Sequence, residues 1–268
     1  MQDNKRLHIG DILQDYSFSD FKIPIILGKK RNDQHPVVHD LATDQRNLLI
    51  VGDESPTKRM DAILSLISLM NGHYNVDLTY IHSAWSENLD DLTFHNLERP
   101  VNRNVTPVGP MGVKYPSGFR AMFLEYGGHA HNETKLRMRY LSRVAKNKER
   151  YGPQDPIHVV AIDDLAQLCG RTDLKFEIQD LLSPDYHNGV VVIAALKTNS
   201  RPNGPVTGNI FKKALGKLKS GMVLTETSDS DMARKYFCVK TGNYGSKIPN
   251  LGAIKVGTVP YLAYLSSV

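Results

Sequence analysis

The sequence has few cysteines, one tryptophan and no long apolar segment. Only 2 of its 268 residues are cysteine, which excludes a small disulfide scaffold and indicates a reducing, cytosolic compartment. No run of about 18 uncharged apolar residues occurs, so no transmembrane helix is expected. Residues 1–6 lack the apolar core of a signal peptide. A hydrophobic content of 41% excludes disorder and collagen, and at this length it allows one large buried core.

A large excess of one charge is also absent, although the basic residues are unevenly placed. The formal net charge is +5 and the isoelectric point is about 9.0. Lysines and arginines gather in the segments 135–150 and 197–219, and the second segment contains no acidic residue. These residues could contact phosphate or an acidic partner, or they could form the solvated faces of two amphipathic helices. We favour the second interpretation, because aromatic residues do not alternate with the basic ones as in single-strand binders.

Short apolar runs alternate with segments of helical periodicity along most of the chain. Residues 23–28 and 36–41 flank a polar, turn-prone segment and predict a β-hairpin. The runs 157–162 and 190–196 are almost entirely apolar, which is typical of strands buried on both faces of a parallel sheet. The other predicted strands are 48–51, 76–82, 222–224, 252–256 and 261–265, and the predicted helices are 57–71, 133–150, 172–182 and 209–218. This alternation predicts an α/β fold.

Two finer predictions concern one helix and the domain boundaries. Residues of the helix 133–150 that share one apolar face are Leu136, Tyr140, Leu141 and Val144. Residues 1–22 mix apolar and acidic side chains and predict a linker or docking segment. Residues 23–268 are predicted to form one domain.

The segment after the strand 48–51 occupies the position of a phosphate-binding loop. Such a loop reads G-x-x-x-x-G-K-[ST]: its glycines let backbone N–H groups surround phosphates, its lysine reaches the β/γ oxygens, and its hydroxyl holds Mg²⁺. Gly52 and Lys58 match, but Thr57 stands at the second glycine and Arg59 replaces the hydroxyl residue. An ordinary strand–turn–helix is the alternative interpretation. The candidate nucleotide-binding residues are Gly52, Ser55, Thr57, Lys58 and Arg59.

Two acidic residues follow the apolar strand 157–162. A Walker B strand has this pattern: its first carboxylate supports Mg²⁺ and its second polarises the attacking water. Asp163 is therefore the candidate metal residue and Asp164 the candidate catalytic residue. Aspartate also favours the first position of a helix, so a helix N-cap is the alternative.

The order of these features along the chain narrows the fold class. The loop at Gly52, the acidic doublet and the strand 190–196 occur in the order of a RecA-like motor core. We therefore predict a RecA-like P-loop NTPase fold with a mostly parallel central sheet flanked by helices. The predicted hairpin would precede this core, and the strands after residue 250 would be additions at its C-terminal end.

These motifs resemble FtsK/SpoIIIE-type ATPase domains. That family reads P-[IVL]-x-[IVL]-G, then P-V-V-x-D-L-A, and later V-V-V-I-D-E-L-A-D-L. This chain reads I-P-I-I-L-G-K at 23–29, P-V-V-H-D-L-A at 36–42 and H-V-V-A-I-D-D-L-A-Q-L at 158–168. The segment 213–254 is similar to the last ATPase-like domain of the type VII secretion coupling proteins, the EssC/EccC group.

The resemblance implies a role for each matching residue. Lys58 would meet the β/γ phosphates, Asp163 would support Mg²⁺, and Asp164 stands where the family has a catalytic glutamate. The family also has a polar residue after the strand 190–196 that senses the γ-phosphate. This residue is replaced around 195–196 by apolar side chains.

The departures from the family pattern are concentrated in the loop. Thr57 and Arg59 break the pattern, and Pro56 removes one N–H group from the phosphate cradle. Because phosphoryl transfer depends on positioning and charge stabilisation, several simultaneous changes predict little or no hydrolysis. Arg59 either clamps phosphate or, as we favour, pairs with acidic residues of a disused site.

The resemblance implies a cytosolic, C-terminal domain of a membrane-bound type VII secretion coupling ATPase. We expect a degenerate domain that acts in substrate recognition and regulation of protein export, with secreted proteins and other domains of the same motor as partners. No tightly bound cofactor is expected. ATP with Mg²⁺ would bind only if the loop can still hold phosphates. The alternative is an active translocase of protein or DNA, and nucleic-acid binding is the least favoured role. The linker-like segment 1–22 indicates a fragment whose upstream parts would contact the membrane.

Overall fold

The computed structural model describes residues 24–30, 35–41, 47–52, 60, 76–82, 113–114, 119–125, 131–146, 157–183, 189–197, 200–218, 220–224, 251–256 and 259–265. The strands in this part of the chain are β1 (Pro24–Lys30), β2 (Pro36–Asp40), β3 (Leu48–Gly52), β4 (Val76–His82), β5 (Val113–Lys114), β6 (Phe119–Glu125), β7 (Ile157–Ile162), β8 (Val190–Lys197), β9 (Ser220–Leu224), β10 (Leu251–Val256) and β11 (Val259–Leu265). The helices are α3 (His131–Lys146), α4 (Leu165–Cys169), the 3-10 helix η5 (Thr172–Leu174), α5 (Lys175–Leu181) and α6 (Pro205–Lys217).

One sheet joins all these strands in the order β2-β1-β11-β10-β9-β3-β8-β7-β4-β6-β5. Its middle is parallel: β9, β3, β8, β7, β4 and β6 pair parallel in that order. Every residue of β8 except the last is buried, as expected for an apolar strand covered on both faces. Asn47 aligns β3 with β8, because its Oδ1 accepts a hydrogen bond of 2.8 Å from the backbone N–H of Val192.

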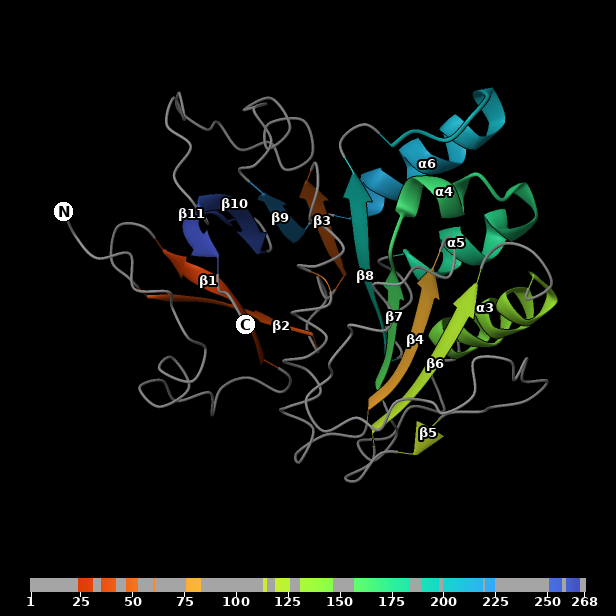
Figure 1. The fold of residues 1–268 in the computed structure, drawn as a ribbon, viewed down its shortest axis with the longest axis horizontal. Coiled ribbons are helices and arrows are strands. Elements are labelled where there is room, and N and C mark those ends of the chain that lie inside the picture. Colours follow the sequence, from red (N-terminus) through yellow and green to blue (C-terminus); the bar gives the residue numbers. More distant parts are fainter. Residues whose placement is uncertain are drawn as a thin grey trace.

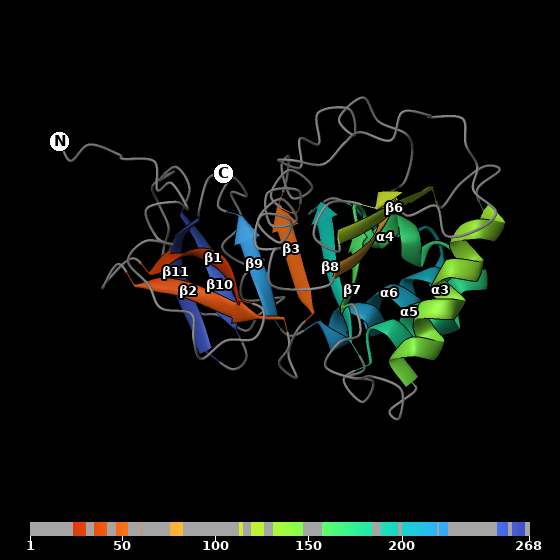
Figure 2. The same cartoon turned by 90° about the horizontal axis from the view of Figure 1, so that it is seen from below.

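The helices pack together against the parallel strands. A single cluster of buried apolar residues includes Leu49, Val160 and Val192 from the sheet together with Met138 from α3 and Ile210 from α6. Figure 1 shows α3, α4, α5 and α6 gathered beside β8, β7, β4 and β6, and the view in Figure 2 shows α3, α5 and α6 close together below these strands. In the described part of the chain, no helix combines the length and the apolar character needed to cross a membrane.

Two antiparallel hairpins extend the sheet on one side. β1 pairs with β2, and β10 pairs with β11, while β9 joins the second hairpin to the parallel strands. β11 also pairs with β1, so the red and blue strands in Figure 1 are neighbours although they lie at opposite ends of the chain. The structure confirms the predicted fold class, the N-terminal hairpin and the extra C-terminal strands.

The structure corrects the sequence predictions in the helical region. The helix predicted at 133–150 corresponds to α3, which starts at His131, and residues 147–150 lie outside the described residues. The helix predicted at 172–182 consists of η5 followed by α5. The short helix α4 was not among the helices predicted from periodicity, although the N-cap interpretation of the acidic doublet implies a helix start there. The predicted apolar face of α3 is wrong in part, because Leu136 is 63% exposed and Tyr140 48% exposed. Leu141 is buried and Val144 packs against the core as predicted, whereas Met138 and Ala145 are buried in place of Leu136 and Tyr140.

Some predictions lie outside the described residues. Within the predicted helix 57–71 only Met60 is described, and it is helical and buried. The segments 53–59 and 225–250 and the predicted linker 1–22 are also outside this part of the chain.

Candidate functional site

The carboxyl ends of β3, β8 and β7 form the candidate site. β8 lies between the other two strands, so one strand separates Gly52 at the end of β3 from Asp163 after β7. From β3 the chain continues to β4, which lies toward the β5 edge of the sheet. From β8 it continues to β9, which lies in the opposite direction, toward the β2 edge. Where connections diverge in this way, open α/β sheets bind ligands beyond the carboxyl ends of their strands.

The structure brings together only part of the predicted site. Gly52 and the doublet Asp163-Asp164 lie at the same edge of the sheet. The other predicted nucleotide-binding residues lie outside the described residues: Ser55, Thr57, Lys58 and Arg59. Gly52 also has a packing role, since a Cβ added there would lie 2.9 Å from Cδ1 of Leu224 on β9.

Asp164 is held by contacts on both carboxylate oxygens. Its Oδ1 accepts hydrogen bonds from the backbone N–H groups of Ala166 (2.9 Å) and Gln167 (3.2 Å), so it caps α4. Its Oδ2 accepts a hydrogen bond of 3.0 Å from the hydroxyl of Ser200. Asp164 is only 6% exposed. These contacts are those of a helix N-cap, the alternative interpretation of the doublet.

A free thiol lies at the other end of the same short helix. Cys169 is buried, as the sequence predicts for a cysteine next to an apolar strand. Burial, with a smaller contribution from the negative charge of Asp164, raises the pKa of the Cys169 thiol to about 12. The thiol is therefore protonated and unreactive at neutral pH.

Two residues at the carboxyl end of β8 and just after it belong to the site, although the motifs did not identify them. Lys197 is exposed at the end of β8, and it is the register partner of Gly52. Ser200 reaches Asp164, and its backbone N–H donates a hydrogen bond of 3.0 Å to the carbonyl of Lys197. Ala195 and Leu196, where the family's sensor residue was expected, are fully buried. In the sequence analysis, Lys197 was noted only as one of the basic residues that gather in the segment 197–219.

Asp163 is the described candidate for support of Mg²⁺, and it would act together with a nucleotide. In the described ranges, no group of three or more His, Cys, Asp and Glu side chains could hold a metal ion. Mg²⁺ in nucleotide sites uses one or two carboxylates together with phosphate oxygens and waters, so the half-buried Asp163 fits such a role. ATP would supply the phosphate oxygens and the reactive anhydride, and Asp163 would orient the metal's water shell.

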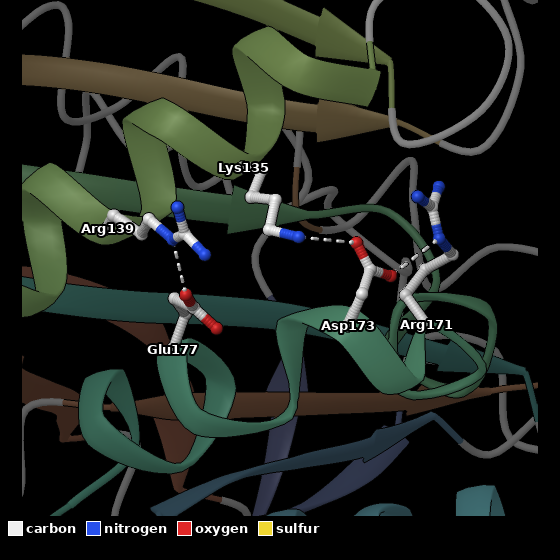
Figure 3. A network of polar contacts seen from close by, with 5 residues as sticks. All are labelled: Lys135, Arg139, Arg171, Asp173 and Glu177. Atoms are coloured by element: carbon white, nitrogen blue, oxygen red, sulfur yellow. Dashed lines mark hydrogen bonds and ion pairs between the residues drawn. The ribbon is translucent and has the colours of Figure 1, made fainter.

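The basic residues of α3 face acidic residues rather than solvent alone. Lys135, Arg139 and Ser142 contact Asp173, Glu177 and Asp180 at 3.5, 3.0 and 2.7 Å, and we call these three contacts the α3–α5 ladder. Figure 3 shows its first two pairs, together with Arg171 at 3.4 Å from Asp173. These ion pairs favour the interpretation of α3 as an ordinary amphipathic helix. They do not favour its use as a phosphate-binding surface.

A second group of charges connects α3 to the sheet. Arg137 donates hydrogen bonds to Oδ2 of Asp77 (3.0 Å) and to Oγ1 of Thr79 (2.9 Å). Nδ1 of His158 lies 3.1 Å from the same oxygen of Asp77. Burial raises the pKa of Asp77, but the His158 ring and the Arg137 charge outweigh it, so the pKa lies below its ordinary value. This group lies near the amino ends of β4 and β7, away from the candidate site.

No protein-family model and no curated protein sequence matches the chain. Solved structures share its fold. The cytoplasmic domain of EssC is 15% identical, with a TM-score of 0.59 over 98% of this chain and 47% of that chain. The conjugation coupling protein TcpA of pCW3, in its monomer form with ATPγS, is 10% identical, with a TM-score of 0.58 over 94% of this chain and 68% of that one.

A third similar structure contains a peptide. EccC of Thermomonospora curvata (ATPases 2 and 3), in complex with a signal sequence peptide, is 14% identical, with a TM-score of 0.56 over 95% of this chain and 42% of that chain. The chain thus spans less than half the length of the EssC and EccC structures. These similarities agree with the FtsK/SpoIIIE-type resemblance at the level of the fold.

Proposed function

We propose that this chain is a degenerate FtsK/SpoIIIE-like ATPase domain of a type VII secretion coupling protein. In this proposal it recognises exported proteins and regulates the motor, and it works in the cytosol beside other domains of the same protein. The shared fold with EssC and EccC supports the proposal. Binding of a signal sequence peptide is a property of the EccC structure, and we extend it to this chain only as part of the proposal.

The main support for the proposal is that both carboxylate oxygens of Asp164 already accept hydrogen bonds. A catalytic carboxylate in this position must be available to polarise the attacking water. Asp164 instead caps α4 with one oxygen and accepts a hydrogen bond from Ser200 with the other. Together with Thr57 and Arg59 in the loop, this arrangement favours a domain with little or no hydrolysis.

An active ATP-dependent translocase is the second candidate. Lys197 favours it, because its exposed side chain provides a cation at the end of β8 next to Gly52. A lysine there could contribute to phosphate binding, as lysines do in other nucleotide sites.

Titration with a fluorescent ATP analogue at millimolar Mg²⁺ separates the two candidates. We expect no micromolar binding, no measurable turnover, and no change in either quantity for Lys58→Ala. The double variant Thr57→Gly, Arg59→Thr restores the loop pattern and is expected to bind nucleotide more tightly than the wild type. Lys212→Ala, on an exposed turn of α6, is the matched control for loss of a positive charge. Micromolar binding with Lys58-dependent turnover would instead establish the active translocase.

A further inference from the structure

The acidic residues of η5 and α5 all belong to one side of these helices. Asp173, Glu177 and Asp180 contact α3 through the α3–α5 ladder. Lys175 and Gln179 of α5 lie on the side toward α6. Phe176 is 71% exposed, and the ammonium group of Lys175 lies 5.5 Å from the centre of its ring. The side of α5 toward α6 therefore carries a positive charge that lies close to an exposed aromatic ring.

A groove of about 290 Å³ lies between this side of α5 and α6. Lys175 and Gln179 line it from α5, and Val206, Ile210 and Lys213 line it from α6. Ile210 is buried, whereas Val206 is 59% exposed. The groove thus has an apolar wall that is open to solvent at one end.

One hydrogen bond ties the two walls of the groove together. Nζ of Lys217 donates a hydrogen bond of 2.7 Å to the backbone carbonyl of Gln179. Gly204 begins α6 with a φ of 93°, and Pro205 occupies the first turn, where its missing N–H costs nothing. The groove is therefore formed by two helices with a defined relative position.

The charged residues that the structure describes in the lining of the groove are both lysines. Neither its lining nor the sequence of α6 contains an acidic residue. Lys213 is exposed and makes no ion pair with any residue that the structure describes. A ligand with negative charge would therefore meet two ammonium groups and no repelling carboxylate.

We propose that this groove binds a short segment of a partner protein in which an apolar side chain is flanked by carboxylates. The apolar side chain would lie against Val206 and Ile210, and the carboxylates would pair with Lys175 and Lys213. At about 290 Å³ the groove has room for one or two side chains of a peptide, and it lies at the lower end of the volumes of small-ligand pockets, which begin at about 300 Å³. Nucleic acid fits less well, since it requires a longer track of cations along its backbone.

This inference gives a location and a ligand chemistry to the recognition role in the proposed function. It rests on that function only in assigning the chain a binding role. The groove residues are distinct from the candidate nucleotide site, so peptide binding is measured without nucleotide. The peptide experiment and the nucleotide titration can therefore fail independently.

The test is a selection of displayed random twelve-residue peptides on the full chain, with counter-selection on the Lys175→Glu, Lys213→Glu variant. We expect the selected peptides to be enriched in aspartate or glutamate next to an apolar residue. In fluorescence polarisation, each single lysine reversal should weaken binding about tenfold or more. Lys212→Glu is the matched control, because Lys212 precedes Lys213 on α6 but does not line the groove. Its effect should stay within about twofold.

The most specific test exchanges the charges of the peptide and the groove. A selected peptide whose acidic residues are changed to lysine should bind the double variant and not the wild type. Thermal unfolding of each variant verifies its fold, and Lys213→Gln replaces any reversal that unfolds. The proposal is overturned if no acidic peptides are enriched, if Lys212→Glu weakens binding as much as Lys213→Glu, or if a 20-base-pair DNA duplex displaces the peptides.

Discussion

Gly221 lies where β9 approaches β3 most closely. Its φ is 154°, and a Cβ added to it would lie 1.9 Å from the carbonyl oxygen of Leu49, its register partner. We expect Gly221→Ala to lower the free energy of unfolding by at least about 3 kcal/mol, because a backbone strand must move. Urea unfolding measures this change.

Gly216 in α6 supplies the control for this prediction. Nothing lies within 4 Å of a Cβ added to Gly216. Gly216→Ala should therefore stabilise the protein by up to about 1 kcal/mol, because alanine favours the helix over the unfolded chain. Similar effects of the two substitutions would contradict the close approach of β9 to β3.

Asp164 provides a second prediction at the scale of a residue. Asp164→Ala should lower the free energy of unfolding by about 1–2 kcal/mol, because it removes the N-cap of α4. Asp164→Asn should cost much less, since its side-chain oxygen still accepts the N–H groups of Ala166 and Gln167. Thermal unfolding of both variants measures the difference. If Asp164 were a catalytic base, both variants would instead lose ATP turnover alike while their stabilities stayed close to that of the wild type.

At the scale of elements, the Asp77–Arg137 pair joins β4 to α3. Asp77 releases its proton at lower pH in the folded chain than in the unfolded chain. Its contribution to stability is therefore present above pH about 4, the ordinary pKa of aspartate, and is lost as the pH falls through the lowered pKa. We expect Asp77→Asn to flatten the acid side of the stability profile, measured by unfolding at several pH values.

The same variant should also be less stable at neutral pH. The side chains of Arg137 and Asp77 are only 12% and 19% exposed, so Asp77→Asn leaves a part-buried cation without its carboxylate and should cost about 2 kcal/mol. Asp173→Asn on the α3–α5 ladder is the control: the side chains of the Lys135–Asp173 pair are more exposed, and it should cost less than about 1 kcal/mol. Equal losses in the two variants would count against the part-buried Asp77–Arg137 pair.

The α3–α5 ladder shows what periodicity does and does not reveal about an element. The sequence analysis identified α3 as a basic amphipathic helix, and the structure confirms that it is helical. The orientation was wrong at Leu136 and Tyr140, which are exposed. Helical periodicity is compatible with several adjacent apolar faces of α3. Packing against the sheet determines that the face with Met138 is the buried one.

At the scale of the whole molecule, pairing of β1 with β11 connects the two ends of the described chain. Removing residues 1–41 deletes β1 and β2 and leaves the edge of β11 without its partner. Because an open edge promotes association and the lost contacts destabilise the sheet, we expect a lower unfolding midpoint and concentration-dependent association. Urea unfolding and light scattering measure both effects.

Removal of residues 1–22 is the matched truncation. It ends before Pro24, where β1 begins, and the sequence predicts that the domain starts at residue 23. This truncation should leave the unfolding midpoint close to that of the full chain. If the two truncations behave alike, the predicted domain boundary is wrong.

Much of the fold could be predicted from local sequence. Apolar runs located β3, β4, β7 and β8 to within about a residue, since strand propensity and burial on both faces depend on the side chains of the run itself. Periodicity did not reveal the helix α4, because it has only five residues, and only the N-cap interpretation of the acidic doublet indicated it. In the candidate site, the motifs located Gly52 and the acidic doublet but not Ser200, because serine after a strand is common.

The sequence by itself determined the strand–helix order, the fold class and the departures of the loop from its family pattern, since each is written in adjacent residues. Only the tertiary structure decided that β8 lies between β3 and β7, that Ser200 reaches Asp164, and that the acidic side of α5 turns toward α3. These contacts join residues 36 or more positions apart. Which distant partners meet depends on how the whole sheet and its helices pack, and no local pattern contains that information.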